Sequence, residues 1–257
     1  MLSGLTGLCL ALPARACPQN LQRGWPGGAA GAVSLTYDDG LNTQLDVAAP
    51  ELERRGWRGT FYLTQDNIGD RLSDWAALAR RGHEVENHTR THPCTLGKFG
   101  SADFERREVK PVESLLANMA GDHSEPTFAY PCGYLGLGRG TRGARYGRYR
   151  RLLERDFKAA RTTAGGPNDP ARVRADRFEL HAFEPTYDTD RLAPAARYLR
   201  ETVQRGAWAI LVFHEIVPEW RGEGDASVGM HARILDMIAD HGLWCAPVGR
   251  VLAELKI

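Results

Sequence analysis

The chain has 257 residues, and its 33 lysines and arginines nearly balance its 32 aspartates and glutamates, leaving a net charge of +1. A chain this close to neutral has no bulk attraction for nucleic acid or for an anionic membrane surface, and neither is expected as a partner. Its length suits one large α/β-barrel domain or two small domains, and its 42% hydrophobic content is that of an ordinary globular protein.

The first residues have the outline of an incomplete secretion signal. An apolar run over residues 5–12 precedes Ala14-Arg15-Ala16, which is typical of a cleavage site, although a basic start is missing. The run is too short to span a bilayer, so no membrane span is expected. We interpret residues 1–27 as a signal remnant and lead-in and residues 28–257 as one domain. A secreted or periplasmic location is expected, with a cytoplasmic one left open.

Predicted strands and helices alternate along the rest of the chain. The strands are predicted over 33–37, 58–63, 83–87, 127–130, 157–161, 178–183, 208–214 and 243–246. The helices are predicted over 44–55, 74–81, 104–119, 146–156, 189–205, 230–241 and 248–255. Such alternation indicates parallel βαβ units, and seven or eight of them favour a barrel. The glycine- and arginine-rich stretch 133–151 is predicted to be a long solvated loop beside the cleft.

The first predicted strand, Val33–Tyr37, ends at two adjacent carboxylates, Asp38 and Asp39, followed by Gly40. The alternation of sides along a strand relaxes at a turn, so both acids can face one cleft at the carboxyl end of the strand. Neighbouring carboxylates repel each other unless a cation or a proton lies between them. The stretch is a candidate metal-and-base site, although Asp-Asp-Gly is also ordinary turn chemistry.

Two histidines, His88 and His92, follow the strand predicted over 83–87. If one helical turn follows that strand, their spacing places both imidazoles on the same face. Two imidazoles and one carboxylate form a ligand set with open positions that suits Zn²⁺ or another divalent ion. For the pair alone, a coincidence in a polar loop is an equal alternative.

Together, these segments resemble the polysaccharide deacetylases of the NodB-homology type, carbohydrate esterase family four. The resemblance rests on Tyr-Asp-Asp-Gly, His-Thr-x-x-His, Phe-x-x-Pro-x-Gly from Phe128 and Leu-Val-Phe-His up to His214, which follow the family order from Ala32 onwards. It implies a distorted (β/α) barrel with seven or eight mostly parallel strands. It also implies metal-dependent removal of an acetyl group from an N-acetylated glycan or amino sugar, in which a metal-bound water attacks the acyl carbon.

The resemblance assigns roles to individual residues. Asp38 would be the general base, and Asp39, His88 and His92 would hold a divalent ion, most simply Zn²⁺, with Co²⁺, Ni²⁺ and Mn²⁺ as alternatives. His214 would be the general acid. The chemistry agrees, because an amide needs a polarised carbonyl, a deprotonated nucleophile and a protonated leaving amine.

Two family positions are altered. Ala129 stands where many members have an arginine that braces the base. Arg161 or Arg174 could substitute from another element, although such an arginine is usually a solvated salt-bridge partner. The acidic residue that orients the acid histidine is not identifiable, and Asp176 and Glu215 are weak candidates.

The turn Cys132-Gly133-Tyr134 is expected to supply a backbone N–H as oxyanion donor and to contact substrate. Cys94 directly follows the histidine motif, and both loops should face the same cleft. We therefore hypothesise a Cys94–Cys132 disulfide, which an oxidising compartment would permit. Two free thiols, or one thiol as an additional metal ligand, are the alternatives.

Two other functions are compatible with this sequence: an amide hydrolase of the same fold acting on a non-sugar substrate, and a carbohydrate-binding barrel that has lost turnover. The presence of all the ligand and acid–base residues argues against the second. Tyr134, Tyr187 and Trp220 lie in predicted loops, where an aromatic ring can stack on a sugar face. The sequence identifies neither the substrate nor the oligomeric state.

Overall fold

The computed structural model describes residues 24–119, 125–186, 189, 191–222 and 224–257. Its centre is a seven-stranded parallel sheet in the order β5-β4-β3-β2-β1-β6, with β9 paired to the start of β1. The strands are β1 (Ala32–Asp38), β2 (Thr60–Leu63), β3 (Glu84–Asn87), β4 (Thr127–Ala129), β5 (Ala159–Arg161), β6 (Trp208–Phe213) and β9 (Trp244–Cys245). A separate two-stranded sheet pairs β7 (Ile216–Val217) with β8 (Ala226–Ser227).

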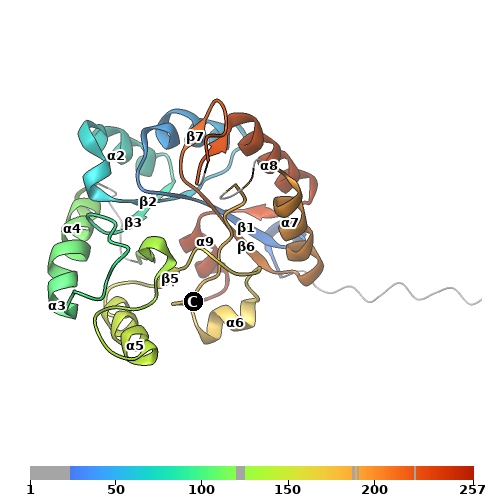
Figure 1. Cartoon of the computed structure of the whole chain (residues 1–257). Helices are drawn as coiled ribbons and strands as arrows, with labels where there is room; N and C mark the ends of the chain where they lie inside the picture. Colours follow the sequence, from blue (N-terminus) through green and yellow to red (C-terminus); the bar gives the residue numbers. More distant parts are fainter. Residues whose placement is uncertain (1–23, 120–124, 187–188, 190, 223) are drawn as a thin grey trace, which may run out of the picture.

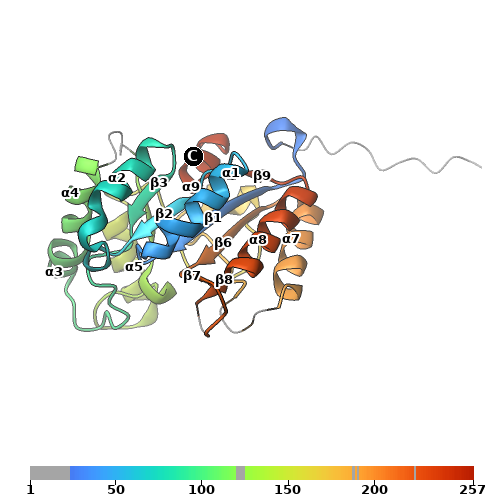
Figure 2. The same cartoon turned by 90° about the horizontal axis from the view of Figure 1, so that it is seen from above.

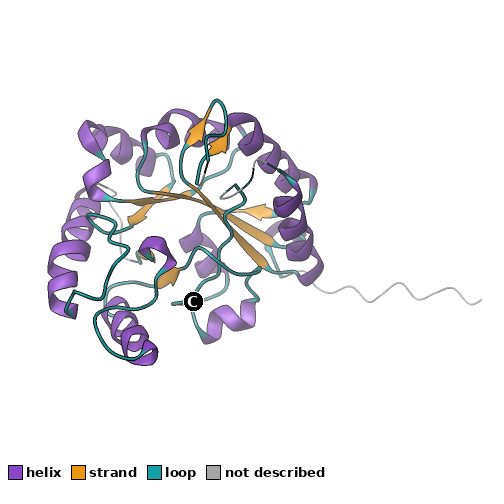
Figure 3. Cartoon of the chain, viewed as in Figure 1, coloured by secondary structure: helices purple, strands orange, loops and turns teal. Residues whose placement is uncertain are grey.

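Most helices lie around the outside of the strands, and α9 (Val248–Glu254) appears at the centre of this view (Figures 1 and 3). The other helices are α1 (Ala49–Arg54), α2 (Leu72–Arg80), α3 (Ser101–Phe104), α4 (Lys110–Met119), α5 (Arg142–Leu153), α6 (Pro170–Ala175), α7 (Ala193–Arg205) and α8 (Val228–Asp240). Seen from above, α7 and α8 lie beside β6 (Figure 2). Among the described residues, no helix has both the length and the apolar character that crossing a membrane requires.

An irregular segment closes the gap between the two edge strands, β5 and β6. Leu180 bridges to Arg161 at the end of β5, and Phe183 bridges to Leu211 in β6. The Phe183 N–H donates to the Ile210 carbonyl at 2.9 Å, and the Val212 N–H donates to the Phe183 carbonyl at 2.9 Å. The predicted strand over 178–183 is therefore present as a segment that changes neighbours part-way and forms no regular strand. The result is the expected distorted barrel.

The alternation of side chains along β1 sets the position of the site. Val33, Leu35 and Tyr37 are buried in one hydrophobic cluster with residues of the surrounding helices. Ser34 and Thr36 point the other way, and their hydroxyls donate to the carbonyls of Ala246 and Leu211, both at 2.8 Å. Asp38 follows in the same alternation, so its carboxylate lies on the inner side of the barrel at the carboxyl end of β1.

Most predicted elements are confirmed within two or three residues, and the differences have local causes. The stretch 133–151 was expected to be a loop, but α5 begins at Arg142, where Thr141 caps the helix by accepting from the Ala144 N–H at 3.3 Å. The short helix α6 was not predicted. It begins behind Asp169, whose carboxylate accepts from the Ala171 N–H at 2.8 Å.

The expected signal segment, residues 1–16, lies outside the described residues. Residues up to 27 were interpreted as a signal remnant and lead-in, and the described part of this stretch, from Gly24, packs on the barrel. Trp25 is 6% exposed, its ring centroid lies 6.2 Å from that of Trp244, and its Nε1–H donates to the Gly206 carbonyl at 2.9 Å.

Candidate active site

The two carboxylates at the end of β1 converge on the same imidazole. Asp39 (φ 78°) and Gly40 (φ 70°) both adopt left-handed backbone conformations, which turn the chain sharply after Asp38. His88 Nε2 lies 3.6 Å from Asp38 Oδ2 and 3.7 Å from Asp39 Oδ1. The sharp turn thus places two consecutive residues on one side, which a continuing strand would not allow.

The histidine loop reaches the expected arrangement without the expected helical turn. His88 follows β3, and Thr89 (φ 69°) and His92 (φ 51°) adopt left-handed conformations. The buried carboxylate of Glu108 holds the loop by accepting from the Thr91 N–H at 3.0 Å and from its hydroxyl. The imidazole centroids of His88 and His92 lie 4.6 Å apart. A prediction from helical spacing was wrong about the backbone here, because tertiary contacts define the loop.

The arrangement fits a divalent cation. One nitrogen each from His88 and His92 and one oxygen of Asp39 all lie within 4.8 Å of one another. The Asp39 Oδ1 to His92 Nε2 distance is 3.8 Å, too long for a hydrogen bond. Asp38 Oδ2 and Asp39 Oδ1 are buried and have no hydrogen-bond partner among the described residues. A cation would satisfy these oxygens, and a carboxylate with two imidazoles is a ligand set that Zn²⁺ accepts.

His88 is prepared to act as a ligand. Its Nδ1 lies 2.9 Å from the carbonyl oxygen of Ala129, which can only accept, so Nδ1 carries the proton and Nε2 has a free lone pair. Burial is the largest influence on this imidazole and lowers its pKa to about 4, with Asp38 opposing the shift. The neutral form that a metal requires is therefore the dominant form at pH 7.

Arg161, one of the two candidates to replace the arginine expected at position 129, contacts Asp38. Its side chain is fully buried (0% exposed), and its Nη2 donates to Asp38 Oδ1. Arg161 on β5 is the parallel register partner of Ala129 on β4, so the guanidinium starts one strand away from the position expected. Burial by itself raises the pKa of Asp38, but Arg161, followed by His88 and His214, outweighs burial and lowers that pKa. The other candidate, Arg174, is exposed on α6.

His214 reaches the same site from the neighbouring strand. β6 pairs with β1 in parallel, with Phe213 opposite Tyr37, so the two strands end together just before His214 and Asp38. The Gln44 side-chain amide ties these ends by donating to the carbonyl oxygens of Asp38 and, at 3.2 Å, His214. The imidazole is half-buried and close enough to Asp38 to lower the pKa of that carboxyl.

The acid near His214 is one that the sequence did not suggest. Burial raises the pKa of Glu184, while the charge of His214, the next largest influence, lowers it. Glu184 directly follows the segment 178–183 that closes the barrel. The sequence could have indicated this residue, because an acid directly after a predicted strand is expected at the edge of the barrel where the site lies. The earlier candidates are engaged elsewhere. Asp176 accepts from Arg150 at 2.7 Å, and Glu215 is paired with Arg221.

A disulfide joins Cys94 and Cys132, whose Cα atoms lie 5.5 Å apart. The Sγ atom of each cysteine lies within 4.8 Å of a His92 ring nitrogen. Cys132 (φ 53°) begins the tight turn expected to donate to an oxyanion. The N–H groups of Gly133 and Tyr134 already donate within that turn, at 2.9 and 3.1 Å, which leaves the Cys132 N–H as the candidate donor. The Tyr134 ring is 54% exposed.

The other two aromatic residues considered for sugar stacking are Trp220 and Tyr187. Trp220 is half-buried, and its Nε1–H donates to the Thr186 carbonyl at 3.3 Å. Tyr187 lies outside the described residues.

Residues 27–138 match the family described as polysaccharide deacetylase. This match covers 112 of the 257 residues, so the chain resembles the family over that part of its length. A chitin deacetylase of Arthroderma benhamiae is 31% identical over 105 residues, covering 38% of this chain and 26% of that protein. A peptidoglycan-N-acetylglucosamine deacetylase of Bacillus cereus is 29% identical over 90 residues, covering 35% of this chain and 32% of that protein.

The fold is shared over a longer stretch than the sequence. A solved structure from Mycobacterium smegmatis, described as a polysaccharide deacetylase, superposes with a TM-score of 0.63 at 16% identity, covering 90% of this chain and 92% of that one. The chain spans 5% to 39% of the lengths of four curated relatives that it matches. The likeness to the solved structure therefore establishes the fold, and the activity and the substrate are separate questions.

Proposed function

We propose that the protein is a metal-dependent N-deacetylase that hydrolyses an acetamide on an N-acetylated glycan or amino sugar. The observation that carries the proposal is the convergence of Asp39, His88 and His92 beside the buried pair of Asp38 and Arg161. The chitin and peptidoglycan deacetylases among its relatives support the choice of an N-acetylated glycan.

Asp39, His88 and His92 are the residues that would hold a divalent ion, with Zn²⁺ the first choice. Such an ion supplies Lewis acidity, which polarises an amide carbonyl and makes a neighbouring water more acidic. The carbonyl of Ala129 fixes the tautomer of His88, and Glu108 fixes the loop that carries His92. The ligand set is therefore positioned by the protein before any substrate arrives.

Asp38 is the proposed general base. Arg161 keeps its carboxylate ionised at neutral pH despite burial, and Oδ2 has no hydrogen-bond partner among the described residues, so it is free to accept the proton of the attacking water. The Cys132 N–H would stabilise the oxyanion that develops on the acyl oxygen.

His214 is the proposed general acid. When the C–N bond breaks, the proton from His214 goes to the leaving nitrogen, so acetate and a free amine are the products. Glu184, a carboxylate near this imidazole, would orient it. We place the reaction in an oxidising compartment, a proposal that the Cys94–Cys132 disulfide supports.

The test is acetate release from neutral chito-oligosaccharides and from simple acetamides by the zinc-loaded protein. Wild type should release acetate from the glycans, and Asp38→Asn should lower kcat by about 10²–10⁴-fold, the usual contribution of general base catalysis. Asp240→Asn, which neutralises an exposed acid of α8, is the matched control and should behave as wild type.

Two outcomes would favour the alternatives. Turnover of acetamides with no acetate from any glycan would indicate an amide hydrolase acting on a non-sugar substrate. Identical background rates for wild type and Asp38→Asn on every substrate would indicate a carbohydrate-binding barrel without turnover.

A further inference from the structure

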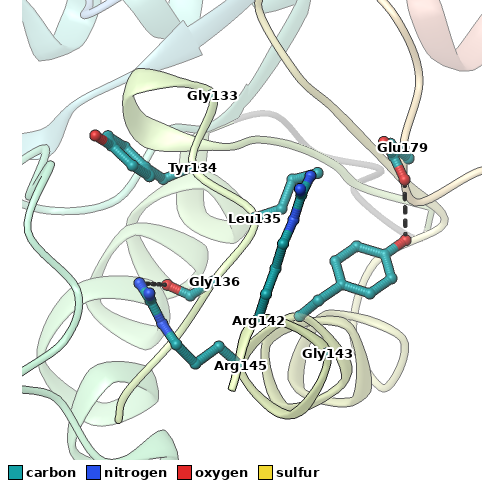
Figure 4. Close-up of a pocket in the computed structure, with 9 residues that line it drawn as sticks. Gly133, Tyr134, Leu135, Gly136, Arg142, Gly143, Arg145 and Glu179 are labelled. Carbon is teal, nitrogen blue, oxygen red and sulfur yellow. Dashed lines mark hydrogen bonds between the residues drawn. The ribbon is translucent and has the colours of Figure 1, made fainter. Parts of the chain in front are cut away.

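A pocket of about 610 Å³ opens beside the site, within the size range of pockets that bind small ligands. We call it the arginine pocket, and its walls include Tyr134, Leu135, Arg142, Arg145, Tyr146 and Glu179 (Figure 4). It begins at Gly133, next to Cys132, whose sulfur lies within 4.8 Å of a His92 ring nitrogen. The pocket is therefore adjacent to the proposed metal site, and the proposed mechanism does not use it.

Two guanidinium groups face this pocket, and neither has an acidic partner among the described residues. Arg142 and Arg145 lie one turn apart at the start of α5, so they share a face of the helix, and Figure 4 shows both side chains at the pocket. No hydrogen bond or ion pair of the Arg142 side chain is found in the described part of the chain. Arg145 Nη2 donates to the Gly136 carbonyl at 3.4 Å, while its buried Nε has no partner there.

The single acid in the wall does not neutralise these cations. Glu179 accepts a hydrogen bond from the Tyr146 hydroxyl at 3.3 Å, and no salt bridge joins it to either arginine. Several other arginines of the described chain form ion pairs with carboxylates, as Arg150 does with Glu154 at 2.7 Å. Arg142 is exposed, and Arg145 is half-buried. Guanidinium groups that line a concave site without a carboxylate partner favour a ligand that brings its own anion.

Tyr134 adds an exposed aromatic face at the entrance. Its ring is 54% exposed, and besides Leu72 it is the only large hydrophobic side chain among the described residues that is exposed in this way. A second cavity of about 410 Å³ shares Tyr134, Gly136 and Arg145 with the arginine pocket, and Arg139 also lines it. An aromatic ring at the junction of two cationic cavities suits a sugar chain with anionic groups.

We propose that the arginine pocket binds an anionic substituent, a carboxylate or a phosphate, on a sugar adjacent to the one that is deacetylated. The proposal rests on the proposed function for the nature of the chain that enters the site, and it extends that function by naming the substrate class as acidic N-acetylated glycans. Arg142 acts as the specificity residue and Arg145 as its neighbour in the same anion site.

Matched substrates give the test. The zinc-loaded protein is assayed with an N-acetylated oligosaccharide that alternates with a hexuronic acid, with the same oligosaccharide after reduction of its carboxylates to alcohols, and with a phosphorylated neutral oligosaccharide beside its unphosphorylated parent. One or both anionic substrates should have a kcat/KM about 10–100-fold above that of the neutral counterpart, mostly through KM, because hydrogen bonds to charged groups contribute about 1.5–3 kcal/mol. The anionic substrate that shows the higher kcat/KM identifies whether the pocket binds a carboxylate or a phosphate.

Variants separate binding from folding. Arg142→Gln should remove the preference for the anion and leave the neutral substrates within about twofold, whereas Arg151→Gln, an exposed arginine of α5 outside the pocket, should leave the preference intact. Equal rates on charged and neutral substrates in wild type, or an equal loss on both in Arg142→Gln, would overturn the proposal.

Direct binding separates this proposal from the proposed function. If no glycan is deacetylated, the proposed function fails, and calorimetric binding of the acidic oligosaccharide still tests the pocket. Binding about tenfold weaker in Arg142→Gln than in Arg151→Gln supports the pocket, and equal binding refutes it.

Discussion

The buried pair of Asp38 and Arg161 gives the sharpest prediction about this protein. Arg161→Met removes the positive charge while keeping most of the side-chain length. Arg161 is the strongest of the influences that lower the pKa of Asp38, so its removal lets burial raise that pKa. The carboxylate then protonates at higher pH, so the acidic limb of the activity profile should move to higher pH.

The magnitude follows from the depth of the pair. Asp38 and Arg161 are 1% and 0% exposed, so solvent does not screen the change. Removing one partner of a buried pair costs about 3–5 kcal/mol of stability. The guanidinium also lies 4.7 Å from the Tyr62 ring centroid, a cation–π contact that contributes about 1 kcal/mol more. We expect kcat to fall about 10²-fold, because the base remains in place but is poorly ionised and less well held.

The assay is kcat as a function of pH, together with thermal unfolding of each variant. Arg161→Lys keeps the charge but loses the two-pronged geometry, and should lie between wild type and Arg161→Met. Because Ala129 is the register partner of Arg161, the double variant Ala129→Arg with Arg161→Ala returns the guanidinium to the neighbouring strand. We expect it to recover at least tenfold of the activity that Arg161→Ala loses.

Two results would refute this reasoning. An unchanged pH profile in Arg161→Met would show that the arginine does not influence the base. A loss of kcat that is equal at every pH would mean that Arg161 acts through packing alone.

Three further predictions concern the metal, the disulfide and a buried histidine. A chelator should abolish acetate release, and one equivalent of Zn²⁺ should restore it. Zinc at 100 times its Kd should add about 2.7 kcal/mol to the free energy of unfolding. A melting temperature that zinc does not change would contradict the site. Thiol titration of the unfolded protein without reductant should detect at most three of the five cysteines, and five would exclude the Cys94–Cys132 bond. His83 accepts from the Gly59 N–H through Nδ1 at 3.1 Å and so is neutral when folded, and burial lowers its pKa to about 4. A lowered histidine pKa stabilises the fold above the unfolded value near 6.5, so this histidine should cause a loss approaching about 3 kcal/mol as the pH falls from 6.5 to 4, and urea unfolding of His83→Asn should lack that slope.

The repeating pattern of strands and helices was predictable because it depends on local periodicity. The buried run Val33–Tyr37 and the apolar strand 208–214 both appear in the structure close to the predicted bounds. The segment 178–183 could not be described fully from sequence, because its apolar residues predict extended backbone but not a change of neighbour from β5 to β6. Pairing partners are set by the closed barrel as a whole.

The same division holds in the site. The proposed ligands were found from motif spacing, although the helical turn expected between His88 and His92 was wrong, because Glu108 stabilises a different loop. Arg161 was named only as a candidate to brace Asp38. Nothing in the local sequence distinguishes a buried arginine at a strand end from a solvated one, and the distinction depends on the register between β4 and β5.

The register of β4 and β5 also affects how functional relatives of this protein should be recognised. If the double variant recovers activity, a guanidinium can reach the same carboxylate from register partners on either of two adjacent strands, and the arginine can change strand in a homologue without other changes to the site. A search for the sequence motif alone would reject this chain, because Ala129 stands at the position of the arginine. A comparison of register partners on neighbouring strands would retain it, and would also detect any homologue in which the arginine has changed strand.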